Sequence, residues 1–486
     1  MEQVESGKST STREDYTSIV RMFTSLRTTR KVCTISEVRL FSSRTAHNVY
    51  ANSEVRLGSV DVLGFDYDFT LVSYKHTVQQ LIYDIAKQYL VENLRYPPAL
   101  ETTTFDPTFC IRGLVFDRKN GNLLKLSSRQ MITPGSVFKG RHRLRYHDVL
   151  DTYNQSLHLS HAHIRRYCRP LPDMFSLAEG CLISDVVQLA EDLQFPYDPY
   201  WLHNDVSKAI NFAHGQGGMH RTIINDVEKY VHPSPHLRTY LTREVDAGKK
   251  LFLLTNSPFD FVDAGMKFLC GEDWLSLFHL SMFEASKPDG FFRSQKRFRA
   301  LDQQNKFMKW GVVSNDEVTK GRALVGGSVN EMMRLTGWHG KQICYLGDHV
   351  FADLAEPSRQ AGWLTGAIVR ELEHEIDVLS SNEYRELSSE GKRIEEDMSL
   401  VSSNVDFEAV EIRRNSNFKY KSNMLNRNFG SVFSSRGQSS MFGWNVRRMS
   451  DFYTSRLDNL LNYPSDYRFF PKQLEHMPHA YQNQQR

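Results

Sequence analysis

One stretch near residue 60 constrains the fold of this chain more than any other. Residues 60–65 are mostly apolar, and the acids Asp66 and Asp68 follow them, with Thr70 next. A short apolar run bounded by polar residues is typical of a strand buried inside a parallel sheet. We therefore predict that residues 60–65 form such a strand and that its carboxyl end presents both acids.

Two later stretches repeat this pattern. Residues 249–254 contain a second apolar run, and Thr255 and Asn256 follow it. Residues 343–346 form a third run, and Asp348 comes shortly after it. Strands of this kind, separated by segments with helical spacing of apolar residues, predict an open α/β sheet. Functional sites in such sheets lie beyond the carboxyl ends of the strands.

The domain organisation follows from length and from what lies between these runs. The chain has 486 residues, which is too long for one small domain. A predicted β-hairpin and two amphipathic helices separate the first two runs, which indicates an inserted cap. We predict a core of residues 53–76 and 236–378, with the cap at residues 77–235 inserted into it. A C-terminal helical and basic extension comprises residues 379–486, and a disordered or targeting segment comprises residues 1–52.

The polar residues at the strand ends are those that carboxylate attack on a phosphoester requires. Such attack needs a nucleophile, an acid for the leaving oxygen, counter-charge and donors for the phosphoryl oxygens. Asp66 can be the nucleophile, and Asp68 can protonate the leaving group and then activate water. Thr255 and Asn256 offer a hydroxyl and an amide to hold the phosphate. Lys287 can neutralise the phosphate together with the nucleophile.

A second group of acids predicts a metal site. Asp348, and less directly Asp353, supply carboxylate oxygens in addition to Asp66 and the backbone carbonyl of Asp68. Oxygen ligands of this kind suit Mg²⁺, which is held by few carboxylates, by waters and by substrate phosphate. We therefore predict Asp66, Asp68 and Asp348 as metal ligands, with Asp353 behind them.

Each motif alone has an ordinary structural interpretation. Thr255 with Asn256 is typical of a turn or a helix cap, and a lone lysine such as Lys287 is usually a solvated surface residue. Asp348 after a glycine is typical of a plain turn. Their order decides the interpretation, because three strand-like runs each end in the right chemistry and the lysine lies between the second and the third.

With these motifs identified, the chain resembles the haloacid dehalogenase-like hydrolases. More narrowly, it resembles the cytosolic purine 5'-nucleotidase family, in particular the 5'-nucleotidase domain-containing proteins. The matching motifs are GFDYDFTL (64–71), LTNSPF (254–259), ASKP (285–288), YLGDHVFADL (345–354), GWLTGAI (362–368), ELEHE (371–375), FGSVF (429–433) and LLNYP (460–464). The similarity covers about residues 60 to 480.

This resemblance implies a Rossmann-like parallel sheet core with a large inserted α+β cap and a C-terminal helical extension. It implies homo-oligomers and Mg²⁺-dependent removal of phosphate from nucleoside 5'-monophosphates, and it gives the site residues the roles stated above. The cap departs from the family pattern. The arginine, aspartate and lysine with which the purine nucleotidases read the base align with Ser207, Asn211 and His220. Loss of such groups weakens base discrimination, so the substrate can be a different phosphoester.

Two alternatives to hydrolysis stay open. The fold can serve as a scaffold or regulatory protein with little or no turnover, which the altered cap favours and the intact motifs oppose. It can also transfer phosphate to a nucleoside, because a phosphorylated Asp66 can be resolved by either acceptor. A basic aromatic tail can bind RNA, but we expect residues 401–486 to pack against the core or a neighbouring subunit.

Composition limits partners and compartment. A net charge of +3 gives no general case for nucleic-acid or membrane binding. No apolar run reaches the ~18 residues of a membrane span. The six cysteines contain no CxxC pair, as in a reducing compartment. We therefore expect a cytoplasmic protein, with mitochondrial import as the alternative because residues 18–52 hold six basic residues and one acid.

Overall fold

The structure is a computed structural model, and it divides the chain into the units Met1–Thr45 and Ala46–Arg486. It describes residues 48–302, 307–315, 318, 320–400 and 404–472. All of these belong to the second unit. The prediction of a disordered or targeting segment at residues 1–52 falls almost entirely outside the described residues.

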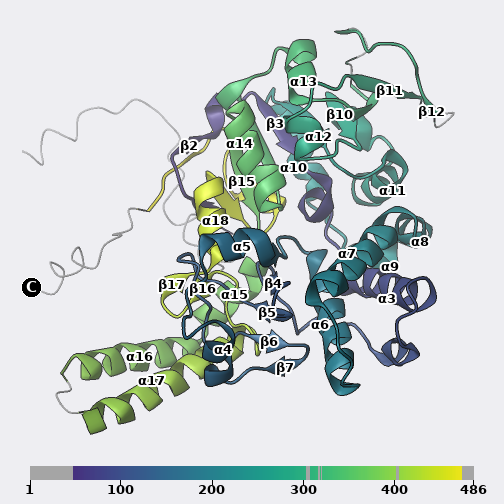
Figure 1. The fold of residues 1–486 in the computed structure, drawn as a ribbon. Helices are drawn as coiled ribbons and strands as arrows, with labels where there is room; N and C mark the ends of the chain where they lie inside the picture. The colour runs from purple at the N-terminus through teal and green to yellow at the C-terminus, as the bar shows by residue number, and fades with distance from the viewer. Residues whose placement is uncertain (1–47, 303–306, 316–317, 319, 401–403, 473–486) are drawn as a thin grey trace, which may run out of the picture. The chain divides into compact units, whose positions relative to one another are not determined.

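A mostly parallel sheet forms the core of the described chain (Figure 1), with strand order β1-β18-β15-β14-β3-β9-β10-β13-β11-β12. Its strands are β1 (Tyr50–Ala51), β3 (Val62–Phe65), β9 (Lys250–Leu254), β10 (Leu280–Phe283), β11 (Phe298–Asp302), β12 (Phe307–Met308), β13 (Ala323–Gly326), β14 (Ile343–Gly347), β15 (Leu364–Ile368) and β18 (Phe452–Thr454). Neighbours from β18 to β13 pair in parallel, whereas β1, β11 and β12 pair antiparallel. The predicted α/β fold with a parallel core is confirmed.

The three predicted strands lie side by side in the middle of this sheet. Strand β3 pairs with β14 on one side and with β9 on the other, and Phe65 is in register with Leu346 and Leu253. The carboxyl ends of the three strands therefore meet at one edge. Gly64 in β3 permits close packing here, because a Cβ atom at this position would lie 2.0 Å from the Phe252 ring.

Both faces of the sheet are buried, as a parallel sheet requires. On β3, Leu63 and Phe65 belong to one hydrophobic cluster and Val62 to another. The core helices are α10 (Leu237–Asp246), α11 (Phe259–Cys270), α12 (Asp289–Phe292), α13 (Val329–Thr336), α14 (Glu356–Ala361) and α15 (Glu371–Ser380). They follow the strands in the alternation that the sequence predicts.

An α+β insertion separates β3 from β9. Its antiparallel sheet has the order β7-β6-β5-β4-β8. The strands are β4 (Val115–Asp117), β5 (Asn122–Leu124), β6 (Phe138–Lys139), β7 (His142–Arg143) and β8 (Cys168–Pro170). The helices are α3 (His76–Glu92), α4 (Tyr146–Thr152), α5 (His161–Tyr167), α6 (Ser176–Asp192), α7 (Pro199–Gly215), α8 (Met219–Asn225) and α9 (Val227–Tyr230). Strands β4 and β5 form the predicted hairpin.

The C-terminal region contains a pair of long helices and then returns to the core. Its elements are α16 (Asn382–Leu400), α17 (Asn404–Leu425), β16 (Ser434–Ser435), β17 (Gln438–Ser439), α18 (Met441–Met449), β18 and β19 (Arg468–Phe469), the last paired with β2 (Val55–Arg56). Strands β1 and β18 join the central sheet although they come from the predicted N-terminal segment and C-terminal extension. No helix in the described part of the chain has the length and apolar character to cross a bilayer.

Candidate active site

Asp66 directly follows β3, and its amide donates a hydrogen bond to Leu346 of β14 at 2.9 Å. The chain then turns through η4 (Tyr67–Leu71), where Phe69 adopts the left-handed conformation with φ 53°. A bulky residue is rare in that conformation. The Phe69 ring packs against Tyr74 and Phe175, with centroids 5.1 and 4.8 Å apart. Burial of this ring holds the turn that separates the carboxylates of Asp66 and Asp68.

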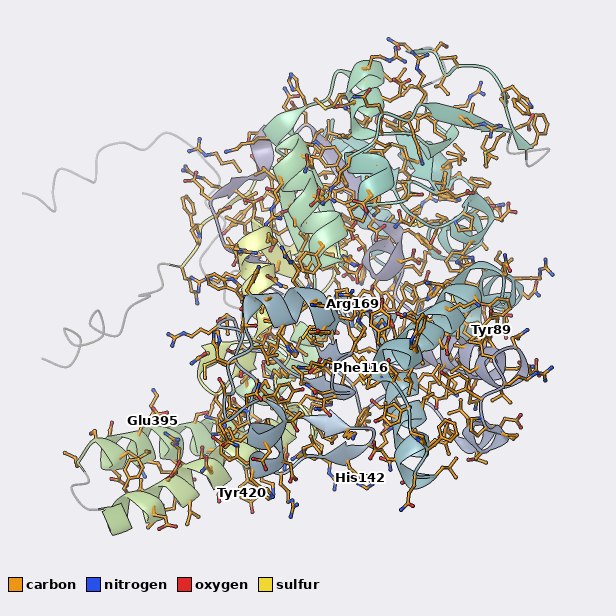
Figure 2. All side chains as sticks on the ribbon, viewed as in Figure 1. Tyr89, Phe116, His142, Arg169, Glu395 and Tyr420 are labelled. Carbon is orange, nitrogen blue, oxygen red and sulfur yellow. The ribbon has the colours of Figure 1, made fainter. Side chains whose placement is uncertain are left out.

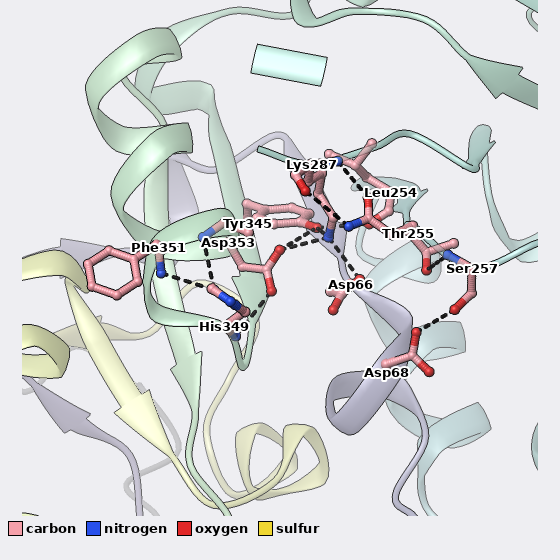
Figure 3. Close-up of polar contacts among 12 residues, drawn as sticks. Asp66, Asp68, Leu254, Thr255, Ser257, Lys287, Tyr345, His349, Phe351 and Asp353 are labelled. Carbon is pink, nitrogen blue, oxygen red and sulfur yellow. Dashed lines mark hydrogen bonds and ion pairs between the residues drawn. The ribbon is translucent and has the colours of Figure 1, made fainter. Parts of the chain in front are cut away.

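Two hydroxyl groups hold the carboxylate of Asp68. Ser257 Oγ donates to Asp68 Oδ2 at 2.6 Å, as Figure 3 shows. Tyr74 donates from its hydroxyl to Oδ1 at 2.7 Å. Ser257 belongs to the segment after β9, so this bond joins the ends of two neighbouring strands. Burial raises the pKa of Asp68, and the hydrogen bonds from Ser257 and Tyr74 partly oppose that rise.

Lys287 lies at the centre of the site and is buried. Its Nζ lies 2.8 Å from Asp66 Oδ1, 2.7 Å from Asp353 Oδ1 and 2.8 Å from the Tyr345 hydroxyl. Burial alone would lower the pKa of Lys287, but the carboxylates of Asp353 and Asp66 outweigh it and raise the pKa. Lys287 is therefore a charged group between two acids, and the prediction that it neutralises the site has the geometry it requires.

The predicted phosphate-binding residues Thr255 and Asn256 lie at the end of β9. Asn256 Oδ1 accepts from the Lys287 amide at 2.6 Å, and its Nδ2 donates to the Lys287 carbonyl at 3.1 Å. The asparagine thus fixes the backbone that carries the lysine. Thr255 Oγ1 accepts from the Ser257 amide at 3.0 Å, which leaves its hydroxyl proton free to donate. Their contact with phosphate remains a prediction.

Three acids converge next to the lysine. Carboxylate oxygens of Asp66, Asp348 and Asp353 lie within 4.8 Å of one another, and all three side chains are buried. Oxygen-only donors of this kind fit Mg²⁺. Asp353 uses Oδ1 for Lys287 and Oδ2 for the His349 amide at 3.1 Å. The predicted position of Asp353 behind the ligands stays a prediction, since its carboxylate belongs to the same group of oxygens as those of Asp66 and Asp348.

Electrostatics also indicate a cation site. Burial and the neighbouring Asp353 raise the pKa of Asp66 to about 8, although Lys287 opposes the rise. Burial raises the pKa of Asp348 well above its usual range, and Arg112 partly opposes this. The carboxylates of Asp66, Asp348, Asp353 and Glu371 meet only the cations Lys287 and Arg112 in these ion pairs, so a divalent cation would stabilise the ionised acids.

Comparison with known proteins identifies the family. The family model described as the 5' nucleotidase family matches residues 49–482. A 5'-nucleotidase domain-containing protein of Dictyostelium discoideum is 35% identical over 93% of this chain and 77% of its own length. The human 5'-nucleotidase domain-containing protein 2 is 32% identical over 87% of this chain and 83% of its own.

The chain belongs to the 5' nucleotidase family. As a member of this family it is a phosphatase, as the sequence motifs predict. Among solved structures, one described as a predicted phosphoglycolate phosphatase from Haemophilus somnus matches at a TM-score of 0.27 and 11% identity, over 64% of this chain and 86% of that one.

Several residues of this candidate site are absent from the sequence predictions. Arg112 precedes β4 and donates from Nη1 to the Asp348 carbonyl at 3.2 Å, while its other nitrogens bond to Glu371 at 2.8 and 2.6 Å. A single arginine inside an apolar stretch is the only local signal for Arg112. Tyr74 has no such signal, because tyrosines occur throughout the chain. Ser257 and Tyr345 lie in the motifs LTNSPF and YLGDHVFADL, but those motifs alone assign them no role.

The cap residues that align with the base-reading positions have different surroundings. Ser207 on α7 donates to Glu179 Oε1 at 2.8 Å, whereas Asn211 on the same helix is exposed. His220 packs on Phe261, with ring centroids 4.4 Å apart. Burial lowers the pKa of His220. The three positions therefore present a hydroxyl, an exposed amide and an uncharged imidazole in place of a charged set.

Proposed function

We propose that this 5' nucleotidase family member is a Mg²⁺-dependent phosphomonoesterase that acts on nucleoside 5'-monophosphates through a phosphorylated Asp66. The observation that carries this proposal is the contact of Lys287 with Asp66 and Asp353, together with the two hydroxyl groups that hold Asp68. This arrangement separates a nucleophile from an acid in one buried site.

In the first step, Asp66 attacks phosphorus with Oδ2, because Lys287 holds Oδ1. A bond forms between Asp66 and phosphorus while the bond from phosphorus to the leaving oxygen breaks. Asp68 donates a proton to that oxygen. Burial raises the pKa of Asp68, which supports its role as a proton donor.

In the second step, water attacks the phosphorylated Asp66 while Asp68, now ionised, takes its proton. Inorganic phosphate leaves, and the carboxylate of Asp66 is restored. The Thr255 hydroxyl and the Lys287 ammonium group hold the phosphoryl oxygens in both steps. Mg²⁺ held by Asp66, Asp348 and the carbonyl of Asp68 would neutralise charge on the phosphate.

A matched pair of variants tests the nucleophile. Asp61→Asn changes an exposed acid just before β3, and Asp66→Asn changes the acid just after it. Phosphate release is measured with Mg²⁺ over a panel of nucleoside monophosphates and small phosphomonoesters. We expect turnover of at least one compound by the wild-type and Asp61→Asn proteins and none by Asp66→Asn. Equal turnover by Asp66→Asn would disprove the assignment.

The same panel separates the alternatives. Absence of turnover on every compound by a folded protein that binds Mg²⁺ would favour a scaffold. Addition of a nucleoside acceptor tests transfer, since a transferase forms a new nucleoside monophosphate and releases less inorganic phosphate. Ser207 stands at a base-reading position, but its hydroxyl donates to Glu179. Because that hydroxyl is already bonded inside the cap, we expect weak discrimination among purine bases.

We also propose that the protein forms homo-oligomers in the cytoplasm. Family membership supports both statements, and the composition is compatible with them. Light scattering after size-exclusion chromatography measures the mass in solution, and a monomer at all concentrations would contradict the first. Fractionation of cells that express a C-terminally tagged chain tests the second, and recovery in mitochondria would favour the presequence interpretation of the N-terminal segment.

A further inference from the structure

The antiparallel sheet of the cap brings metal-ligating side chains together at one end. Asp117 ends β4, and its register partners are Asn122 on β5 and Cys168 on β8. Directly paired residues project their side chains to the same face of a sheet. Phe116 and Arg169, the adjacent register pair, mark this place in Figure 2.

Helix α5 adds an imidazole to this face. His163 Nε2 lies 3.2 Å from Asp117 Oδ2. Ligand atoms of Asp117, His163 and Cys168 all lie within 4.8 Å of one another, and Asp117 and Cys168 are buried. This spacing is close enough for the three atoms to share one small cation. The cluster is separate from the acids around Asp66, since it contains a thiol and an imidazole.

Two polar atoms at this place have no hydrogen-bond partner among the described residues. They are His163 Nε2 and Asn122 Oδ1, and both are buried. The contact between His163 and Asp117 is short but lacks the alignment of a hydrogen bond. Buried polar atoms without partners are rare and require an explanation. A cation next to Asp117 would accept a lone pair from both atoms.

Stabilisation of the β4–β5 hairpin turn explains why Asp117 is present, but it does not explain the other residues of the cluster. Asp117 Oδ1 accepts from the Lys119 amide at 3.0 Å, and Oδ2 accepts from Asn120 at 2.8 Å and from the Tyr153 hydroxyl at 3.0 Å. These bonds hold the hairpin turn and orient the carboxylate, as partners behind a metal ligand do. They do not account for His163 Nε2, which lies 3.2 Å from Asp117 Oδ2 without a hydrogen bond.

We propose that Asp117, His163 and Cys168 bind a Zn²⁺ ion that fastens α5 and β8 to the β4–β5 hairpin. One thiolate, one imidazole and one carboxylate suit Zn²⁺, whereas Mg²⁺ and Ca²⁺ select oxygen ligands. The Asn122 carbonyl oxygen or a water completes a tetrahedral set. The ion reaches the site past His163, whose side chain is 17% exposed.

The test uses the full-length protein, stripped by a chelator and titrated with Co²⁺ in excess Mg²⁺. Co²⁺ substitutes for Zn²⁺, and a thiolate ligand gives a charge-transfer absorption band that the acids around Asp66 cannot give. We expect the band in the wild-type protein, its loss on addition of Zn²⁺, and a rise in Tm with Zn²⁺. Cys168→Ser should lose the band. His163→Gln removes a direct ligand and should weaken binding by more than the about 10- to 100-fold that loss of a partner behind a ligand costs.

Two matched variants serve as controls. His161→Gln changes an exposed histidine on the same helix, and Cys270→Ser changes a buried free thiol elsewhere. Both should keep the band and the Zn²⁺-dependent Tm. Circular dichroism verifies that all variants fold. Absence of the band in the wild-type protein, or an unchanged band in both His163→Gln and Cys168→Ser, would overturn the proposal.

Discussion

At the scale of single residues, Lys287 controls the charge balance of the active site. It is the cation that contacts both Asp66 and Asp353. We predict that Lys287→Met lowers kcat about 100- to 1,000-fold, because the phosphoryl oxygens lose a buried positive partner. Without Mg²⁺ the variant should also lose about 3 kcal/mol of unfolding free energy, since two buried carboxylates then lack their cation.

Steady-state kinetics and urea unfolding measure these two effects. Lys296→Met is the control, because Lys296 is an exposed lysine in the segment that follows α12. It should change neither quantity. We expect added Mg²⁺ to restore part of the stability of Lys287→Met, as a cation among the acids replaces the missing charge. Wild-type kcat in Lys287→Met would contradict the assigned role.

At the scale of elements, Arg112 joins the cap to two other parts of the fold. Its guanidinium group pairs with Glu371 of α15 and lies 4.7 Å from the Phe442 ring of α18. We predict that Arg112→Met costs about 3 kcal/mol, because it leaves the half-buried Glu371, whose side chain is 18% exposed, without this partner. The double variant Arg112→Met/Glu371→Gln should recover part of this loss. Strictly additive losses in urea unfolding would show that the two side chains are not coupled.

The packing of α7 on β4 predicts a pH dependence of stability. His203 on α7 stacks on Phe116 of β4 with centroids 5.7 Å apart, and burial lowers its pKa from 6.5 to about 4. The unfolded chain therefore binds more protons between these values, so stability rises with pH across that interval. On acidification from pH 6.5 to 4 we expect a loss of about 2–3 kcal/mol from this residue.

Urea unfolding at several pH values measures this slope. His203→Gln should show a smaller dependence on pH than the wild-type protein between pH 6.5 and 4. The control is His339→Gln, which changes an exposed histidine before β14 and should keep the wild-type slope. An unchanged slope in His203→Gln would mean that other groups control acid unfolding.

At the scale of the whole molecule, local signals predicted the motif-bearing strands and missed the long-range ones. An apolar run that is followed by Asp66 or Asp348 can be recognised from about ten consecutive residues. Strand β18 has only three residues, too few to show a period, and its place beside β15 depends on a partner far away in the sequence. The same holds for Arg112, because only the folded chain shows that it reaches Asp348.

The C-terminal region has two parts that differ in how much they contribute to the stability of the core. Helices α16 and α17 pack on each other, and Figure 1 shows them extending side by side. The apolar side chains of Ile412 and Tyr420 on α17 are exposed. The later part supplies β18, and the carbonyls of Phe429 and Ser434 accept from the buried Lys125 of the cap at 3.0 and 2.7 Å.

We therefore predict that replacement of residues 382–425 by a five-residue Gly/Ser linker leaves a folded protein. The His374 ring contacts the Leu425 carbonyl at 3.1 Å, so the two cut ends lie roughly 10 Å apart along α15. Five extended residues span about 16 Å. A chain that ends at residue 378 should instead aggregate, because β18 and its pairing with β15 are lost. Thermal melts and size-exclusion profiles separate the outcomes, and a soluble, cooperatively melting chain of residues 1–378 would show that the core does not need its last parallel strand.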